Sequence, residues 1–319
     1  MIAGRSIDRV LVIKLGALGD FLLALGPMQA IRRRHSDARI TLLTRAAYRD
    51  LAAASGLFDA IWIDPAPRYN PLSWLSLRAR LRGGRFDRVY DLQTSDRSAS
   101  YFRLLGGAGG PEWSGRAPGC SHRHAYTSPS PLHTVERQRE QLAIAGIDDV
   151  PLADLAFLDA EISARLPRRP FVLMIPGASA GRPAKRWPVG RFAVLAARLA
   201  AEGLGTAIAG TAGEGDLAAA IQAEAPEALD LTGATDLPEL AAFARAARLV
   251  VGNDTGPTHL AALAGAPTLA LFSADSAPAR TGPRGPHTRF LQRPVLADLA
   301  VEDVLAATDE WRTADPRDR

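Results

Sequence analysis

VLVIKLGALGD, residues 10–20, joins an apolar, β-branched run to a glycine-containing turn and an acidic residue. The run at 10–13 is typical of a strand buried on both faces in a parallel sheet. Gly16 and Gly19 permit a tight turn and a close backbone approach before a helix begins. A strand that enters a helix in this way starts a βαβ unit, so this stretch predicts an α/β fold.

The same alternation of strand and helix continues through most of the 319 residues, a length that suggests two domains. Strands are predicted at 10–14, 40–44, 60–63 and 89–92, and, beyond a proline-flanked segment at 164–170, at 171–175, 206–209, 228–231, 249–251 and 268–272. Helices are predicted at 134–145, 191–202, 214–224, 237–245 and 257–264, with a last helix near 301–312. This pattern predicts two doubly wound, Rossmann-like domains at 1–166 and 167–300, followed by a C-terminal helical segment at 301–319.

The composition excludes several classes of protein. Hydrophobic residues make up 47% and charged residues 23%, which excludes global disorder, and the single cysteine, Cys120, favours a reducing compartment. No apolar run reaches the roughly 18 residues needed to cross a bilayer, so we expect a cytoplasmic protein. Aromatic residues total 6% and are not interleaved with the arginines, which disfavours nucleic acid as a partner.

Positive charge is concentrated in the first half of the chain. Residues 1–169 contain 24 Arg and Lys against 17 Asp and Glu, a net charge of +7, whereas residues 170–319 contain 14 against 17, or −3. Most of the excess lies between Arg68 and Arg139. This basic half is either an ordinary solvated surface or one that attracts an anionic substrate or a membrane.

Because ligands of such sheets bind at the carboxyl ends of the strands, the loops that follow strands are the candidate sites. The first of these, at 14–20, lacks the third glycine of the Gly-x-Gly-x-x-Gly dinucleotide fingerprint. It also places Asp20 at the helix start, where a carboxylate would repel a pyrophosphate. Asp20 is either a plain N-cap or an ionised carboxylate available as a general base.

The loop PGASAGRPAKRWP, residues 176–188, follows the first strand of the second predicted domain. Its small residues allow backbone N–H groups to approach a phosphate, with Lys185 or Arg186 supplying positive charge. The alternative is an exposed loop with ordinary surface cations. The loop is not a Walker A sequence, because no Gly-Lys-Ser/Thr opens the next helix.

The loop VGNDTGPTH, residues 251–259, again closes a strand and opens a helix. Asp254 or Thr255 can cap that helix, and the amides of Thr255 and Gly256 can bind an anionic oxygen. A phosphate would repel Asp254, which therefore suits sugar hydroxyls better. His259 is either a structural residue or a ligand contact.

Two weaker candidates also follow strands. Glu214, after GTAG at 210–213, can hydrogen-bond ribose hydroxyls or simply favour the helix dipole. Arg97, in DLQTSDRS at 91–98, can pair with an acceptor carboxylate. An ordinary surface residue is the alternative for each.

Together these loops resemble glycosyltransferase family 9, the ADP-heptose:lipopolysaccharide heptosyltransferases. The resemblance is carried by GALGD at 16–20, by PGA at 176–178 with PAKRWP at 183–188, and by NDTGPTHLAA at 253–262 with GAP at 265–267. It spans about residues 8–290 and implies a GT-B architecture, two Rossmann-like domains facing a central cleft. The acceptor would bind the N-terminal domain and the nucleotide sugar the C-terminal domain.

The resemblance also implies roles for individual residues. Asp20 would be the catalytic base, and Lys185 would contact the donor phosphates together with Thr255 and Gly256. Asp254 would hold the donor sugar and Glu214 the ribose. The other implied positions are Ser179, Gly181 and His259 at the donor site, and Gly16 and Arg97 at the acceptor site. The last helix would cross back to the first domain.

The reaction implied is an inverting, metal-independent transfer of a heptose from ADP-heptose to a hydroxyl of the lipopolysaccharide inner core, without a cofactor. The implied partners are the nucleotide sugar, the core acceptor and the cytoplasmic face of the inner membrane. Three other classes remain open. They are a sugar-nucleotide epimerase of the same architecture, a nicotinamide-dependent dehydrogenase, which the missing glycine disfavours, and a noncatalytic sugar-nucleotide sensor.

Overall fold

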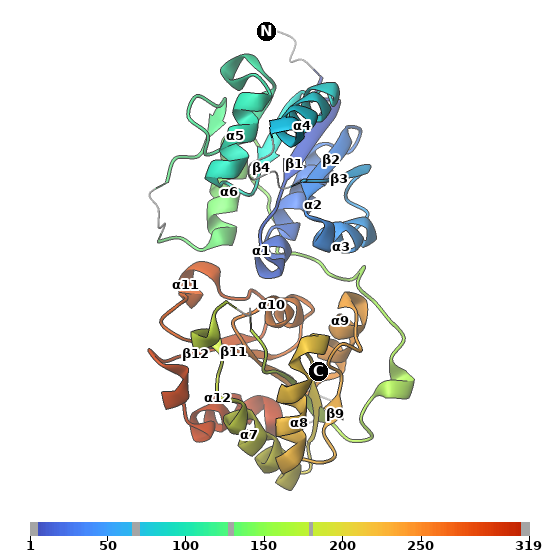
Figure 1. Ribbon diagram of the computed structural model, residues 1–319, viewed down its shortest axis with the longest axis vertical. Helices are drawn as coiled ribbons and strands as arrows, with labels where there is room; N and C mark the ends of the chain where they lie inside the picture. Colours follow the sequence, from blue (N-terminus) through green and yellow to red (C-terminus); the bar gives the residue numbers. More distant parts are fainter. Residues whose placement is uncertain (1–5, 66–70, 127–130, 179–180, 314–319) are drawn as a thin grey trace. The chain divides into compact units, whose positions relative to one another are not determined.

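The protein divides into two compact units, Met1–Asp154 and Leu155–Arg319. The computed structural model describes residues 6–65, 71–126, 131–178 and 181–313 (Figure 1). The predicted boundary at 166/167 is wrong, because residues before it already belong to the second unit. Arg245 donates to the carbonyl oxygens of Leu155 and Leu158 at 2.8 and 2.6 Å, and Arg165 lies 2.6 Å from a carboxylate oxygen of Glu239.

The first unit contains a six-stranded parallel sheet in the order β3-β2-β1-β4-β5-β6. Its strands are β1 (Arg9–Ile13), β2 (Arg39–Thr44), β3 (Ala60–Ile63), β4 (Arg88–Asp91), β5 (Glu112–Gly115) and β6 (His122–Arg123). Its helices are α1 (Leu18–Leu23), α2 (Leu25–Arg34), α3 (Arg49–Ala54), α4 (Pro71–Gly83), α5 (Asp96–Leu104) and α6 (Thr134–Ile144). The sequence did not predict β5 and β6, because both are short and lie among the Gly, Pro, Ser and His residues of 106–131.

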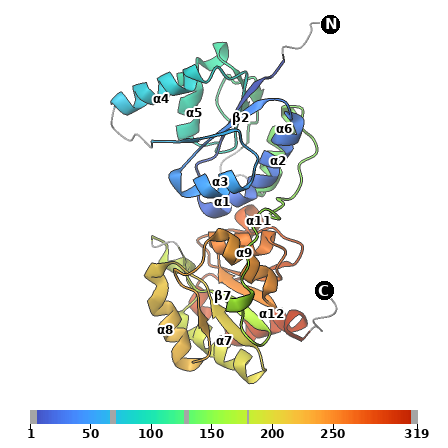
Figure 2. The same ribbon diagram turned by 90° about the vertical axis from the view of Figure 1, so that its right-hand side faces the viewer.

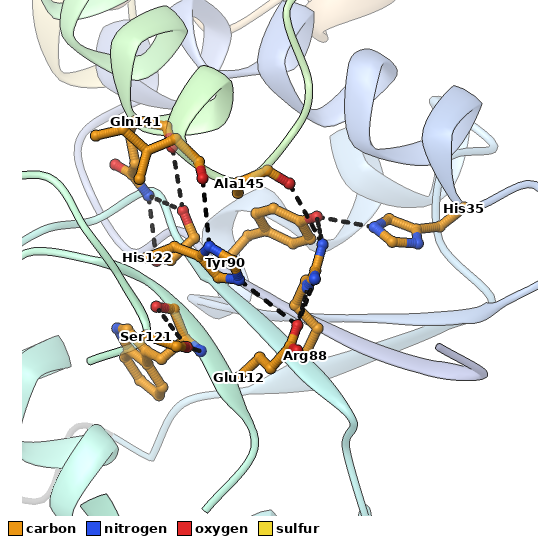
Figure 3. A network of polar contacts seen from close by, with 11 residues as sticks. His35, Arg88, Tyr90, Glu112, Ser121, His122, Gln141 and Ala145 are labelled. Atoms are coloured by element: carbon orange, nitrogen blue, oxygen red, sulfur yellow. Dashed lines mark hydrogen bonds and ion pairs between the residues drawn. The ribbon is translucent and has the colours of Figure 1, made fainter. Parts of the chain in front are cut away.

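Helices cover both faces of the first sheet (Figure 2). On one face, Leu11 and Val89 lie in an apolar cluster with Leu77 and Leu81 of α4 and Tyr101 of α5. On the other face, the buried Tyr90 hydroxyl lies 2.8 Å from His35 Nε2, just after α2 (Figure 3). This alternation along β4 is the period of two expected of a strand packed between two helical layers.

The second unit contains a six-stranded parallel sheet in the order β12-β11-β10-β7-β8-β9. Its strands are β7 (Phe171–Ile175), β8 (Gly205–Ile208), β9 (Leu229–Asp230), β10 (Leu249–Asn253), β11 (Thr268–Phe272) and β12 (Thr288–Gln292). Its helices are α7 (Val189–Ala201), α8 (Gly215–Glu224), α9 (Leu237–Ala246), α10 (Gly256–Leu263), α11 (Pro278–Thr281) and α12 (Val301–Thr313).

Both sheets have the same strand order when the strands of each unit are counted from its own first strand. That order, 3-2-1-4-5-6, is the one found in dinucleotide-binding Rossmann folds. In the first unit, successive strands are added on one side of β1 as far as β3, and β4 is then added on the other side of β1. In the second unit, the same change of side occurs between β9 and β10, on either side of β7. These changes make β1/β4 and β7/β10 the switch points of the two sheets. Ligands bind outside the carboxyl ends of the strands at such a switch point, so each unit has one expected crevice.

The last helix, α12, packs within the second unit. Val304 and Trp311 are buried in the same apolar cluster as Phe192 of α7, and α12 also contacts β10. The helix is therefore part of the second unit, and its contact with the first domain stays a prediction. Within the described residues, no helix combines the length and apolar character required to span a membrane.

Candidate functional site

Asp20 lies in the first turn of α1 but does not cap that helix. The N-cap position is Ala17, and α1 has no side-chain cap hydrogen bond. The Asp20 carboxylate forms no hydrogen bond or ion pair with any other side chain or backbone group among the described residues. The plain N-cap alternative is therefore wrong, and the partly exposed carboxylate is left available at the carboxyl end of β1.

Gly16 gives Asp20 the space that it occupies. A Cβ on Gly16 would lie 3.1 Å from Asp20 Cβ and 3.2 Å from Asp20 Oδ2. Both distances are tighter than ordinary van der Waals contact, so a side chain at position 16 would displace the carboxylate. Whether Gly16 also touches an acceptor stays a prediction.

Two buried charged groups lie at the same switch point, and the sequence did not single them out as site residues. Lys14 directly follows β1, and its Nζ donates to the carbonyl oxygen of Leu92 at 3.2 Å. Asp91 ends β4, and its Oδ1 accepts from the backbone N–H groups of Gln93 and Thr94 at 3.1 and 2.9 Å. The sequence feature that could have identified Lys14 and Asp91 is a charged residue at the end of an otherwise apolar strand.

Burial dominates the ionisation of both groups. It lowers the pKa of Lys14, against the opposing effect of the Asp20 and Asp91 carboxylates. It raises the pKa of Asp91 to about 6, although the backbone N–H groups of Thr94 and Gln93 and the charge of Lys14 act in the other direction.

Arg97 is engaged with its own unit. Its Nη2 lies 2.6 Å from Oδ1 of the buried Asp64, and its Nε donates to the Tyr101 hydroxyl at 2.6 Å. That hydroxyl in turn donates to Asp64 Oδ2 at 2.8 Å. Arg97 therefore joins the end of β3 to α5, and its contact with an acceptor stays a prediction.

In the second unit, Asn253 holds the two loops of the switch point together. Its side chain is fully buried, its Oδ1 accepts from the backbone N–H of Trp187 at 3.0 Å, and its Nδ2 donates to the Pro176 carbonyl oxygen at 2.7 Å. The sequence pattern includes Asn253 but indicated no role for it. That role depends on β10 lying beside β7, which the sequence alone does not fix.

Lys185, Asp254 and His259 lie together in this crevice. Lys185 Nζ is 2.5 Å from Asp254 Oδ2, and His259 Nε2 is 3.7 Å from Asp254 Oδ1. Burial raises the pKa of Asp254, but hydrogen bonds from His259, Lys185 and Ser276 outweigh that effect and lower the pKa to about 2. Asp254 is thus a firmly ionised carboxylate, and Lys185 is its counter-ion.

Glu214 reaches the same crevice from the loop after β8. Its Oε2 accepts from the backbone N–H of Thr211 at 2.7 Å. A Cβ on Gly177 would lie only 2.0 Å from Glu214 Oε1, so only glycine leaves space for this carboxylate beside the loop after β7. The structure therefore brings Glu214 next to the loop that leads to Lys185.

Thr255 and Gly256 lie where an anionic oxygen can be received. Thr255 is the N-cap residue of α10 without a side-chain cap bond, and Gly256 is the first residue of that helix. Helix N-termini carry unsatisfied N–H donors and a partial positive charge. Gly181 is exposed, with no neighbour within 4 Å of a Cβ placed on it, and Ser179 lies outside the described residues.

The two crevices differ in chemical character. The first has the Asp20 carboxylate, which no described side chain pairs with, and the second combines a lysine, a helix N-terminus and two carboxylates. A carboxylate accepts a proton from a hydroxyl, whereas a lysine and helix amides bind a diphosphate. Within the described residues, no group of three or more His, Cys, Asp or Glu is arranged to hold a metal ion.

Proteins with similar sequences include several heptosyltransferases. Lipopolysaccharide heptosyltransferase 1 of Pseudomonas aeruginosa is 28% identical over 298 residues, covering 87% of this chain and 81% of that protein. Lipooligosaccharide heptosyltransferase 2 of Haemophilus influenzae is 36% identical over 119 residues, covering 36% of this chain and only 34% of that protein.

A solved structure supports the assignment of the fold. The Escherichia coli heptosyltransferase WaaC with ADP-2-deoxy-2-fluoro heptose matches with a TM-score of 0.74 at 21% identity, covering 95% of this chain and 99% of that chain. The sequence model of glycosyltransferase family 9 (heptosyltransferase) matches residues 74–299, well over half of the chain. The chain therefore belongs to glycosyltransferase family 9, the heptosyltransferase family, and is a glycosyltransferase.

Proposed function

We propose that this protein transfers a heptose from ADP-heptose to a hydroxyl of the lipopolysaccharide inner core, with inversion and without a metal ion. The observation that carries the proposal is the division of chemistry between the two switch points. The first offers the Asp20 carboxylate as a base, and the second offers Lys185 and the start of α10 to a diphosphate.

In the proposed reaction, the acceptor hydroxyl oxygen attacks the anomeric carbon while the bond from that carbon to the ADP oxygen breaks. The hydroxyl proton goes to Asp20, and ADP leaves with the electron pair of the broken bond. Because nucleophile and leaving group lie on opposite faces of the sugar, the anomeric configuration inverts. The transition state is oxocarbenium-like, as in glycoside hydrolysis.

The donor would bind the second unit. Lys185 and the amides of Thr255 and Gly256 would stabilise the charge that develops on the departing diphosphate, a role that a metal ion has in other transferases. Asp254 would bind hydroxyls of the heptose and Glu214 those of the ribose, with His259, Ser179 and Gly181 nearby. The solved structure of WaaC with a fluorinated ADP-heptose analogue supports this choice of donor.

The acceptor would bind the first unit beside Asp20, with Gly16 and Arg97 as further contacts. The net charge of +7 over residues 1–169 suits the acidic sugars and phosphates of the inner core. The names of the related heptosyltransferases support a lipopolysaccharide acceptor. We expect the protein to work in the cytoplasm, at the cytoplasmic face of the inner membrane.

Helix α4 is the segment best suited to that membrane contact. Leu72 and Leu75 in its first turns are 73% and 58% exposed, and its last turn carries Arg80 and Arg82. Exposed leucines on a helix that also carries arginines favour binding to an anionic bilayer surface.

The test is a transfer assay with purified protein, ADP-heptose and a truncated core acceptor, read by mass spectrometry and by NMR of the new anomeric centre. We expect a product heavier by one heptose, with inverted configuration, in the presence of a chelator. Donor incubated without acceptor is the control, because an epimerase would convert the donor alone. Donor binding without any product would instead indicate a noncatalytic sensor and would contradict the proposal.

A further inference from the structure

A buried ammonium group and a buried carboxylate lie at the ends of the neighbouring strands β1 and β4, and the proposed mechanism does not use them. Lys14 is 4% exposed and Asp91 is 1% exposed. Their strands are neighbours, and Ile13, the residue before Lys14, lies opposite Asp91 in the parallel register. The two charges therefore flank the switch point.

The hydrogen bonding of this pair is incomplete within the described residues. Lys14 Nζ donates to the Leu92 carbonyl oxygen, although an ammonium group has three donors. Asp91 Oδ2 is buried without a hydrogen-bond partner there. Burial of an incompletely paired ion costs several kcal/mol, so stability alone does not account for two such groups at one site.

Asp91 is linked to the loop of Asp20 through Gln93. The Asp91 carboxylate fixes the turn after β4, in which Thr94 has a φ of +48°, a conformation that a β-branched residue rarely adopts. Gln93 Oε1 then accepts from the backbone N–H of Leu15 at 2.8 Å. Backbone strain held by surrounding contacts is typical of functional sites.

Lys14 interacts with Asp20 through its charge. The charged groups that face Lys14 are Asp20 of α1, Asp91 of β4 and Arg137 of α6. Asp20 in turn faces Lys14 and Tyr48, the residue before α3. Asp20 is therefore one of the carboxylates whose charge acts on Lys14.

We propose that Lys14 and Asp91 are positioning residues for the transfer reaction, acting on substrate only through Asp20. Asp91 fixes the turn after β4, Lys14 ties Leu92 of that turn to the end of β1, and Gln93 of the same turn holds the loop of Asp20 through Leu15. This inference rests on the proposed role of Asp20.

The test compares Lys14→Met, Asp91→Asn and the double variant. Lys14→Met should lower kcat roughly 10- to 100-fold, less than loss of the base itself, with the KM for ADP-heptose within about twofold of wild type.

The double variant separates positioning from stability. Each single variant leaves one buried charge unpaired and should lower the melting temperature, whereas removing both charges should restore much of it. We expect kcat of the double variant to stay low, because the turn that holds the loop of Asp20 still lacks the hydrogen bonds of Lys14 and Asp91. If kcat recovers together with the melting temperature, Lys14 only neutralises Asp91 and the inference is wrong.

Arg88→Met is the matched control. Arg88 begins β4, at the opposite end from Asp91, and forms an ion pair with Glu112 (Figure 3). Its loss should lower the melting temperature and leave kcat unchanged.

Asp20→Asn, measured in the same assay, distinguishes the two proposals. If Asp20→Asn retains full turnover, or wild type transfers no heptose, the proposed function fails and this inference with it. If Asp20→Asn is inactive while Lys14→Met and Asp91→Asn have wild-type kcat, only this inference fails.

Discussion

At the scale of single residues, the proposed donor site depends on competition for Lys185. Its ammonium group lies 2.5 Å from Asp254, so an entering diphosphate must share the lysine with a carboxylate or replace that carboxylate as its partner. The sequence predicted which loops contain these residues, because glycine and proline at strand ends mark ligand-binding turns. It did not predict the ion pair, or the roles of Asn253, Lys14 and Asp91, since those depend on which strands are neighbours.

Lys185→Ala should weaken ADP binding roughly 10- to 100-fold, the range expected for loss of a charge-assisted contact, and slow transfer as well. Isothermal titration with ADP measures the first effect and the transfer assay the second. Arg182→Ala is the matched control, because Arg182 is an exposed cation of the same loop. Equal effects of the two substitutions would mean that Lys185 contributes only general positive charge.

At the scale of elements, apolar runs predicted nine strands to within a few residues, because strands buried in a parallel sheet are continuous in their apolar character. The exceptions have physical reasons. β5 and β6 are short, and β12 is only partly buried, so its sequence, TRFLQ, lacks the apolar run of a buried strand. The packing of α12 on α7 was not predicted, because an amphipathic pattern identifies a buried face but not its partner.

The contact between α2 and β4 should make stability depend on pH. Burial, followed by the charges of Arg88 and Arg34, lowers the pKa of His35 to about 4 from 6.5 (Figure 3). Below pH 6.5 the unfolded state therefore binds a proton that the folded state does not, and stability falls as pH decreases towards 4. From pH 7 to pH 5 this contribution amounts to about 2 kcal/mol.

His35→Gln should remove this loss of stability between pH 7 and pH 5, and urea unfolding at both pH values measures the loss. The pH dependence of stability in the variant must be compared with that of wild type. The raised pKa of Asp91 makes stability increase, not decrease, as pH falls over the same range. His287→Gln, at an exposed histidine, is the control. An unchanged pH dependence in His35→Gln would show that His35 does not titrate as described.

At the scale of the whole molecule, one chain carries two sheets of identical strand order with different chemistry at their switch points. The proposed acceptor side has the excess positive charge, and its α4 presents two exposed leucines. The fold and the positions of the loops that follow the strands could be predicted from the sequence, because the βα pattern repeats. The choice of α4 as the segment for membrane contact could not, since it depends on which apolar side chains the fold leaves exposed.

Leu72→Asp with Leu75→Asp should lower co-sedimentation with vesicles containing phosphatidylglycerol by roughly tenfold or more, because burial of a leucine is worth about 1.5–3 kcal/mol. Binding of wild type should also weaken with salt and with purely zwitterionic vesicles. Val194→Asp, at an exposed valine of α7, is the control. Equal sedimentation of the leucine variant and wild type would rule out α4 as the contact.

The central claim is that the carboxylate of the first unit performs proton transfer and takes no part in holding the donor. Turnover and ADP affinity of Asp20→Asn, measured on one preparation, test it most directly. We predict a fall in kcat of roughly 100-fold or more with an ADP dissociation constant close to that of wild type. Normal turnover, or turnover lost only in proportion to ADP affinity, would contradict the account.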